Sequence, residues 1–273
     1  MSNQLNQDQL GPLPQDSWVI GDVHGCLRTL KAMLSKIERV QADPHCVFIG
    51  DLVGKGPDSA GVIETLMNNS DNVSVVLGNH DLHLIACHMG VAKARPGDHS
   101  ENLLKASESN KWIDWLKTQN FLFDLNCANR RYQLVHAGIH PLWSEEELDQ
   151  RINQLTMHVR SDDWSWYKDP GSEIWHTANV ITRMRCLQRE SLGLANDFTG
   201  HPDDAGPDLI PWFEATSGRP QDPVFIFGHW AALGRYSTEK VECLDSGCVY
   251  GHELTAFQPM NQIALVEKNI ELD

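Results

Sequence analysis

The sequence lacks the features that mark a membrane-spanning or secreted chain. None of its apolar segments approaches the roughly 20 residues that a helix needs to cross a bilayer. Residues 1–17 are polar and lack the basic stretch followed by an apolar run that a signal peptide requires. The seven cysteines are odd in number and include no Cys-x-x-Cys pair, so no zinc or redox motif of that kind is indicated. We therefore predict a flexible tail at 1–17, no membrane partner and a reducing, cytoplasmic location.

Positive charge is also scarce. The 273 residues include 22 Lys and Arg against 37 Asp and Glu, which gives a formal net charge of -15 at pH 7. The electrostatic field of such a molecule repels a long nucleic acid or an anionic membrane surface. An anionic substrate must then be held by a local cationic site. Bound divalent metal ions would provide one, because each ion is a concentrated positive charge.

Short apolar runs that alternate with amphipathic stretches predict an α/β fold. Residues 18–20 indicate a buried strand, and leucines and an isoleucine at helical spacing follow over 27–37. The same pattern predicts strands at 46–49 and 73–77, helices around 62–67 and 82–87, and later strands at 121–125, 132–135, 224–227, 241–244 and 254–257. Strands that alternate with helices predict a mostly parallel sheet, whose functional groups gather at the carboxyl ends of the strands.

We expect residues 18–273 to form a single domain with one insertion. The segment 141–221 differs in character from the rest, because it carries five tryptophans, many acidic residues and a run rich in Gly and Pro at 200–207. We interpret this segment as an inserted, mainly helical cap over the site.

Five short motifs follow the predicted strands: GDVHG at 21–25, GD at 50–51, GNHD at 78–81, VHAG at 135–138 and FGH at 227–229. Each motif alone is weak, since a strand that ends in Gly-Asp is often only a turn. Together they provide carboxylate, imidazole and amide ligands in numbers that suit two divalent ions such as Mn, Fe, Co or Zn.

Parallel strands bring their carboxyl ends to one rim, which suggests how these ligands divide between two ions. Asp22 and His24 lie two residues apart and can reach one ion from the same loop, and Asp51 is placed to bridge both ions. Three further side chains would complete the second ion: Asn79, His136 and His229. A metal pair roughly 3.5 to 4 Å apart activates a bridging hydroxide and neutralises phosphoryl oxygens. His80, beside Asn79, is the natural proton donor to the leaving oxygen.

In this order, GDVHG, GDLVGKG, GNHD, VHAG and FGHW resemble the calcineurin-like metallophosphoesterase superfamily, and the match spans nearly the whole chain beyond the tail. This resemblance implies a two-sheet β-sandwich flanked by helices, with the metals at its edge. GNHDLHLIA, TRMR at 182–185, GPDLIPWF at 206–213, FGHWAALGRY and LDSGCVYG narrow the resemblance to the symmetrical bis(5'-nucleosyl)-tetraphosphatases.

The resemblance also implies roles for residues outside the metal motifs. Arg183 and Arg185 would normally be read as a solvated surface pair, but the TRMR segment implies that they bind phosphate, which suits the planar guanidinium fork. Phosphoprotein phosphatases have Asp-Arg where this chain has Gly54 and Lys55. Lys55 keeps the positive charge for substrate binding, while the loss of the Asp removes a partner of the catalytic histidine. We expect Asp81 to orient His80 instead.

These features predict an enzyme that splits diadenosine tetraphosphate and related dinucleoside polyphosphates into two ADP, using two divalent ions. Mn is the leading candidate metal, with Co, Fe, Zn and Mg left open. One alternative is a related phosphatase that acts on phosphoproteins, polyphosphate or capped RNA 5' ends, and another is a non-catalytic sensor that only binds such nucleotides. No protein partner is implied.

Overall fold

The computed structural model describes residues 12–215 and 223–271. Most of the predicted tail, residues 1–11, lies outside the described residues. The rest of that segment is packed on the domain: Leu13 contacts an apolar cluster between the two sheets, and Ser17 is fully buried. The Ser17 hydroxyl donates a hydrogen bond of 2.6 Å to the Pro14 carbonyl. The described chain is therefore packed on the domain from Leu13 onward.

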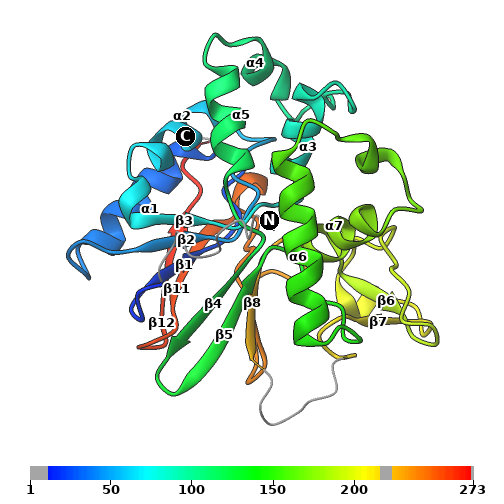
Figure 1. Ribbon diagram of the computed structural model, residues 1–273. Helices are drawn as coiled ribbons and strands as arrows, with labels where there is room; N and C mark the ends of the chain where they lie inside the picture. Colours follow the sequence, from blue (N-terminus) through cyan, green and yellow to red (C-terminus); the bar gives the residue numbers. More distant parts are fainter. Residues whose placement is uncertain (1–11, 216–222, 272–273) are drawn as a thin grey trace, which may run out of the picture.

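Two five-stranded sheets form the centre of the molecule (Figure 1). The first sheet has the order β12-β11-β1-β2-β3, with bounds Ile263–Lys268, Glu253–Gln258, Trp18–Ile20, Cys46–Phe48 and Val73–Val75. The second has the order β4-β5-β8-β10-β9, with bounds Leu122–Cys127, Arg130–Val135, Val224–Phe227, Val241–Cys243 and Tyr236–Ser237. Strands β1, β2 and β3 are parallel to one another, and so are β5, β8 and β10.

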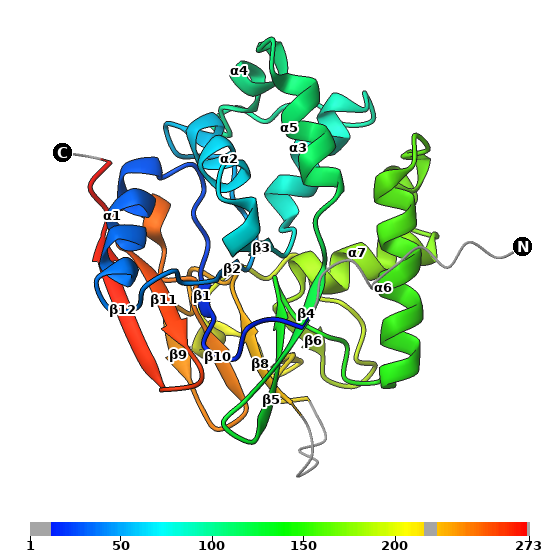
Figure 2. The same cartoon turned by 60° about the vertical axis from the view of Figure 1, so that its left-hand side comes forward.

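Helices cover the outer faces of this sandwich (Figures 1 and 2). Their bounds are Leu27–Glu38 for α1, Ser59–Met67 for α2, Asn79–His88 for α3, Ser100–Lys105 for α4, Ser109–Lys117 for α5, Glu145–Arg160 for α6 and Glu173–Arg183 for α7. Figure 2 shows α1 beside β11 and β12, and α6 on the opposite side of the molecule. Ser144 caps the N-terminus of helix α6, because its hydroxyl accepts a hydrogen bond from Glu147 N, and the first turn holds three glutamates that interact favourably with this end of the helix.

The strand residues alternate between two apolar clusters, as side chains on successive positions of a strand must. Trp18 and Ile20 of β1 point into the larger cluster beneath the helices, whereas Val19 points into the cluster between the sheets. From the other sheet, Tyr132, Leu134 and Ile226 meet Val19 there. This double burial explains why β1 reads as an uninterrupted apolar run.

The β-sandwich flanked by helices that the resemblance implies is confirmed. A single, mostly parallel sheet is wrong, because the parallel strands divide into two sets of three. Antiparallel strands β11 and β12 extend the first set on one side, and antiparallel strands β4 and β9 lie at both edges of the second. Four strands were not predicted: β6 (Cys186–Gln188), β7 (Leu209–Pro211), β9 and β12. These strands are short or half-exposed, so their apolar pattern is faint.

The segment predicted as a cap contains α6 and α7, three short 3-10 or strand elements between 186 and 211, and the 3-10 turn Ser165–Lys168. Residues 216–221 of that segment lie outside the described residues, and its role as a cap stays a prediction. In the part of the chain that the structure describes, no helix is both long and apolar enough to span a membrane.

Candidate metal centre

The predicted ligands lie at the carboxyl ends of strands from both sheets. Asp22 follows β1, Asp51 follows β2 and Asn79 follows β3, while His136 follows β5 and His229 follows β8. The two sheets are tied together at this edge, since His136 Nδ1 lies 2.7 Å from the Ile49 carbonyl oxygen and His229 N donates to Asp22 Oδ2 at 3.1 Å. Strand ends of two sheets, rather than of one, therefore surround the site.

Four residues at or beside the site have a strained backbone conformation. His24, Asp51, Lys55 and His229 all have positive φ angles, of 48°, 50°, 60° and 65°. For residues with a β-carbon this left-handed region is uncommon and costs free energy, and such residues cluster at functional sites. The loops are thus shaped to direct these four side chains at the expense of local conformational energy.

Three histidines direct their inner ring nitrogen toward the centre of the site. In each, the outer ring nitrogen faces a backbone carbonyl: His24 Nδ1 lies 3.1 Å from Val53 O, His136 Nδ1 lies 2.7 Å from Ile49 O, and His229 Nε2 lies 3.0 Å from Arg183 O. A carbonyl oxygen only accepts, so the outer nitrogen carries the proton in each ring. In the neutral rings of His24 and His229 the inner nitrogen is then free to bind a cation, and the inner nitrogen of His136 becomes free once its second proton is lost. This is the usual arrangement of metal-ligating histidines.

The inner donor atoms form two groups that share Asp51. One group contains His24, Asp51 and His80, the other contains Asp51, His136 and His229, and within each group the ligand atoms lie within 4.8 Å of one another. The Asp51 Oδ2 atom lies 3.5 Å from Nε2 of both His24 and His136. A carboxylate shared in this way can bridge two cations.

The Asn79 amide supplies a further test of whether cations fit here. The amide oxygen lies 3.3 Å from His136 Nε2 and faces only acceptor atoms. If the amide oxygen and nitrogen are exchanged, the nitrogen can donate a hydrogen bond to His229 Nδ1 at 2.8 Å. Converging acceptors without hydrogens between them are what a cation site requires. Carboxylate, imidazole and amide donors suit hard or borderline divalent ions, so the residues fit a metal pair.

Asp22 belongs to neither of these two groups of ligand atoms. Its carboxylate accepts from His229 N at 3.1 and 3.2 Å and is almost fully buried. Burial, together with the nearby Asp245 and Asp51 carboxylates, raises the pKa of Asp22 well above its ordinary value. A neighbouring cation would remove this repulsion. The assignment of Asp22 as a ligand stays a prediction.

The other pKa shifts indicate that, without bound cations, protonated histidine balances the negative charge of the buried carboxylates. Burial opposes the charged form of Asp51, but His136, His80 and His24 together hold the pKa of Asp51 well below its ordinary value. Burial alone would lower the pKa of His136, yet Asp51 and Asp22 raise it to about 9. His136 therefore carries a positive charge at the position where a cation would bind.

The structure corrects the role predicted for Asp81. Its Oδ2 accepts from Gly78 N at 2.9 Å, and its Oδ1 accepts from Leu52 N at 2.9 Å and Val53 N at 3.3 Å. Asp81 therefore ties the loop after β2 to the start of α3, and its oxygens are engaged by backbone N–H groups instead of the His80 ring. The His80 ring is near two other carboxylates: Asp98 Oδ1 lies 3.8 Å from Nδ1, and Asp51 belongs to the same group of ligand atoms.

Three positively charged side chains lie near the cluster, and their role in binding substrate stays a prediction. Arg185 donates from Nη2 to the carbonyl of His229 at 3.0 Å, and its Nε is buried without a hydrogen-bond partner among the described residues. Arg183 is the last residue of α7, and its carbonyl oxygen accepts a hydrogen bond from His229 Nε2. The Lys55 ammonium contacts the Tyr250 hydroxyl and lies 4.6 Å from the centre of the Tyr250 ring.

Sequence reasoning missed three residues at this site. Asp245 directly follows the predicted strand at 241–244, is buried, and its electrostatic influence reaches Asp22 and His24; the strand-end rule applied to the other ligands would have found it. Tyr250 lies in the LDSGCVYG segment but was not singled out. No sequence motif marks Asp98, because its position beside His80 depends on how the turn at 95–98 packs against the site.

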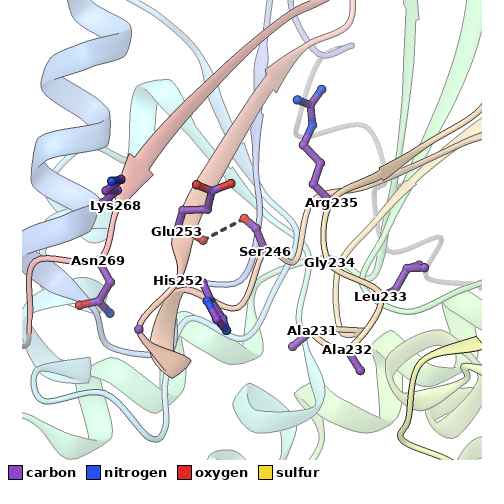
Figure 3. Close-up of a pocket in the computed structure, with 11 residues that line it drawn as sticks. Ala231, Ala232, Leu233, Gly234, Arg235, Ser246, His252, Glu253, Lys268 and Asn269 are labelled. Atoms are coloured by element: carbon purple, nitrogen blue, oxygen red, sulfur yellow. Dashed lines mark hydrogen bonds between the residues drawn. The ribbon is translucent and has the colours of Figure 1, made fainter.

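A separate cavity of about 580 Å³ lies beyond the metal centre (Figure 3). It is lined by residues 231–235, which follow His229 and Trp230, and by Ser246, His252, Glu253, Lys268 and Asn269. Ser246 donates to the Glu253 carbonyl at 2.8 Å, and Asn269 Nδ2 donates to the Cys248 carbonyl at 2.6 Å. No residue of the two groups of ligand atoms around Asp51 lines this cavity.

The family follows from comparison with known proteins. Residues 17–256 match the family model described as calcineurin-like phosphoesterase. The chain belongs to this family. Calcineurin-like phosphoesterases hold a pair of divalent metal ions, and the His and Asp groups around Asp51 provide donors for such a pair.

Several relatives of this calcineurin-like phosphoesterase are similar along almost their whole length. Proteins from Shewanella sp. (strain W3-18-1) and Shewanella oneidensis, both called symmetrical bis(5'-nucleosyl)-tetraphosphatase, are 34% and 32% identical to it over 93% of this chain and 98% of theirs. A solved structure described as a proposed diadenosine tetraphosphatase has a TM-score of 0.66 at 22% identity, covering 95% of this chain and 96% of that one. A serine/threonine phosphatase from Saccharomyces cerevisiae has a TM-score of 0.55 at 14% identity, covering 93% and 80%. The two structures support the fold.

Proposed function

We propose that this phosphoesterase hydrolyses dinucleoside tetraphosphates symmetrically, so that diadenosine tetraphosphate and water give two ADP. The observation that carries the proposal is the Asp51 carboxylate shared by two groups of metal-binding side chains. The relatives that match along almost their full length are called symmetrical bis(5'-nucleosyl)-tetraphosphatases, which supports this substrate over other phosphate esters.

Six side chains would hold the two ions. Asp22, His24 and Asp51 would bind the first, and Asp51 would bind the second together with three others: Asn79, His136 and His229. When bound, the ions supply a water-derived nucleophile at neutral pH and neutralise phosphoryl oxygens. We propose Mn as the working metal, since imidazole and carboxylate oxygens together suit it, and Co, Fe, Zn and Mg are the alternatives to be compared.

Three cationic side chains would hold the phosphate chain. The buried Nε of Arg185 has an N–H to donate, and a phosphate oxygen would satisfy it. Arg183 and Lys55 flank the same centre, because the charges of both act on the His80 ring. This local positive charge lets a polyphosphate approach a chain whose net charge is -15.

His80 would donate a proton to the leaving phosphate oxygen. Attack at one of the two central phosphorus atoms breaks its bond to the bridging oxygen between them, and the proton from the ring goes to that oxygen. Burial lowers the pKa of His80 to about 3 in the free protein. The negative charges of a bound polyphosphate act in the opposite direction and favour the protonated ring.

Product analysis tests this function. The purified protein would be incubated with diadenosine tetraphosphate and Mn in ¹⁸O-labelled water, and the nucleotides separated by ion exchange. ADP as the sole product, with one label in a terminal phosphate, supports symmetrical hydrolysis. AMP plus ATP would contradict it, and turnover only of a phosphopeptide or of a capped RNA 5' end would transfer the function to those substrates.

Two matched variants make the assay specific for this site. Asp51→Asn keeps the shape of the shared carboxylate but removes its charge, and it should abolish product. Asp114→Asn makes the same change on α5 outside the metal-binding groups and should leave turnover unchanged. We also propose that the protein works in a reducing, cytoplasmic environment, which fits its seven free cysteines.

A further inference from the structure

The proton donor of the proposed reaction has no side chain beside it in the loop after β2. Residue 54 is a glycine with φ of 93°, and a β-carbon built there would lie 2.7 Å from His80 Nδ1. This backbone position therefore points directly at the ring nitrogen, but it carries nothing that could accept its proton. Asp81, the next carboxylate along α3, is occupied by backbone N–H groups.

A carboxylate from a different loop faces the same nitrogen. Asp98 Oδ1 lies 3.8 Å from His80 Nδ1, and both side chains are nearly buried, with 9% and 11% of their surface exposed. The second oxygen, Asp98 Oδ2, is buried and has no hydrogen-bond partner among the described residues. A buried carboxylate oxygen that accepts no hydrogen bond is costly, so folding alone gives no reason to keep an aspartate here.

The turn that carries Asp98 is built to present it. Asp98 N donates to the Arg95 carbonyl at 3.2 Å across Pro96 and Gly97, and Gly97 has φ of 88°. Proline followed by a glycine with positive φ is the pattern of a type II turn, which holds its last residue in a defined place. Ser100, just beyond the turn, is buried, and its hydroxyl donates to the Asp98 carbonyl at 3.4 Å.

We infer that Asp98 is a positioning residue for His80, taking the place that Gly54 leaves empty. Its carboxylate accepts a hydrogen bond from Nδ1–H and fixes the orientation and the neutral tautomer of the ring. When the ring is doubly protonated, Nε2–H delivers its proton to the leaving oxygen, and the ring returns to the neutral Nδ1–H form. Asp98 itself gains no proton in this step. The 3.8 Å separation is longer than a hydrogen bond, and such catalytic contacts shorten when substrate binds. This inference rests on the proposed function.

The contact that the His80 ring makes with His24 agrees with this arrangement. His80 meets His24 edge to face, with ring centres 4.7 Å apart and planes at 86°. The ring is thus held between His24 on the metal side and Asp98 on the opposite loop. A ring without Asp98 would keep its contact with His24 but would lose the acceptor that selects its tautomer.

The kinetic experiment compares Asp98→Asn with the wild-type enzyme loaded with Mn. We expect kcat for diadenosine tetraphosphate to fall about tenfold, a part of the 100-fold or more that general acid catalysis contributes, with KM within about twofold. Glu101→Gln is the matched control, because that carboxylate lies three residues further on and contacts only Lys105 among the pairs seen. An unchanged kcat in Asp98→Asn would overturn the inference.

A spectroscopic measurement separates a positioning role from a structural one. In protein labelled with ¹⁵N-histidine and loaded with diamagnetic Zn, the His80 signals, assigned by their loss in His80→Ala, should show a protonated Nδ1. Asp98→Asn should shift this ring toward the other tautomer while the remaining histidine signals stay in place. An unchanged tautomer would refute the pairing. If the wild-type protein makes no ADP, the proposed function fails, while the tautomer result still decides the pairing.

Discussion

In the metal-free protein, His136 should couple stability to pH. Asp51, 3.5 Å from its ring, is the main group that opposes the effect of burial and raises the pKa of His136 to about 9. An unfolded histidine titrates near 6.5. The folded chain therefore binds this proton more tightly, so the stabilisation is fully present below pH 6.5 and is lost as the pH rises through 9.

The size of the effect follows from the two pKa values. A shift from 6.5 to about 9 corresponds to about 3.5 kcal/mol, at about 1.4 kcal/mol per pKa unit. Most of this loss, about 2 kcal/mol, falls between pH 6.5 and 8.5. The other cluster histidines act in the opposite direction near pH 6.5, because burial lowers the pKa values of His24, His80 and His229 and they gain a proton only on unfolding. This contribution is the same in the His136→Gln variant, so the difference between the two proteins isolates His136.

Urea unfolding in EDTA at pH 6.5, 7.5 and 8.5 measures this loss. The free energy of unfolding of the wild-type protein should fall by about 2 kcal/mol more across this range than that of His136→Gln. His158→Gln, a histidine on α6 outside the cluster, should behave as wild type. Parallel pH dependence in wild type and His136→Gln would refute the reasoning. Calorimetry of Mn binding near pH 7.5, in buffers of different ionisation enthalpy, should also show release of about one proton.

Three further predictions concern catalysis, phosphate binding and the core. His80→Ala should lower kcat by about 100-fold but less than His24→Ala, because the ADP leaving group departs fairly well without a proton; equal losses in initial-rate assays with Mn would contradict this division of roles. Arg185→Lys keeps the charge but loses the planar fork, so KM for diadenosine tetraphosphate should rise by about tenfold, and an unchanged KM would remove Arg185 from the phosphate site. Trp212 is fully buried and packs on Phe225 and Phe227, with ring centres 5.3 and 5.4 Å apart. Trp212→Ala should cost about 3 to 5 kcal/mol in urea unfolding, against a much smaller loss for Trp212→Phe.

Much of the metal centre could be read from the chain because its donors obey a local rule. Asp22, Asp51, Asn79, His136 and His229 each stand directly after, or a few residues beyond, a short apolar strand, and the carboxyl ends of parallel strands meet. The same rule applies to Asp245, which was passed over because no histidine or second carboxylate stands near it in the motif. The strands themselves were visible where both faces are buried.

Long-range packing limited what could be read in the same way. The division of the strands into two sheets depends on which sheet faces pack against each other. Val19 packs in one cluster with Tyr132 and Ile226, and each of these partners is more than 100 residues away in the chain. Half-exposed strands such as β12 have too faint an alternation to show in the sequence.

The sequence by itself determined the chemical identity of the donors, their placement at strand ends and the predominance of acidic charge. Only the tertiary structure decided how those donors are completed: the carbonyls of Val53, Ile49 and Arg183 set the tautomers of three histidines. It also decided that Asp81 holds loops together while Asp98 faces His80. The physical reason is that a donor's type is a property of one residue, whereas its orientation and protonation depend on partners that folding brings from elsewhere in the chain.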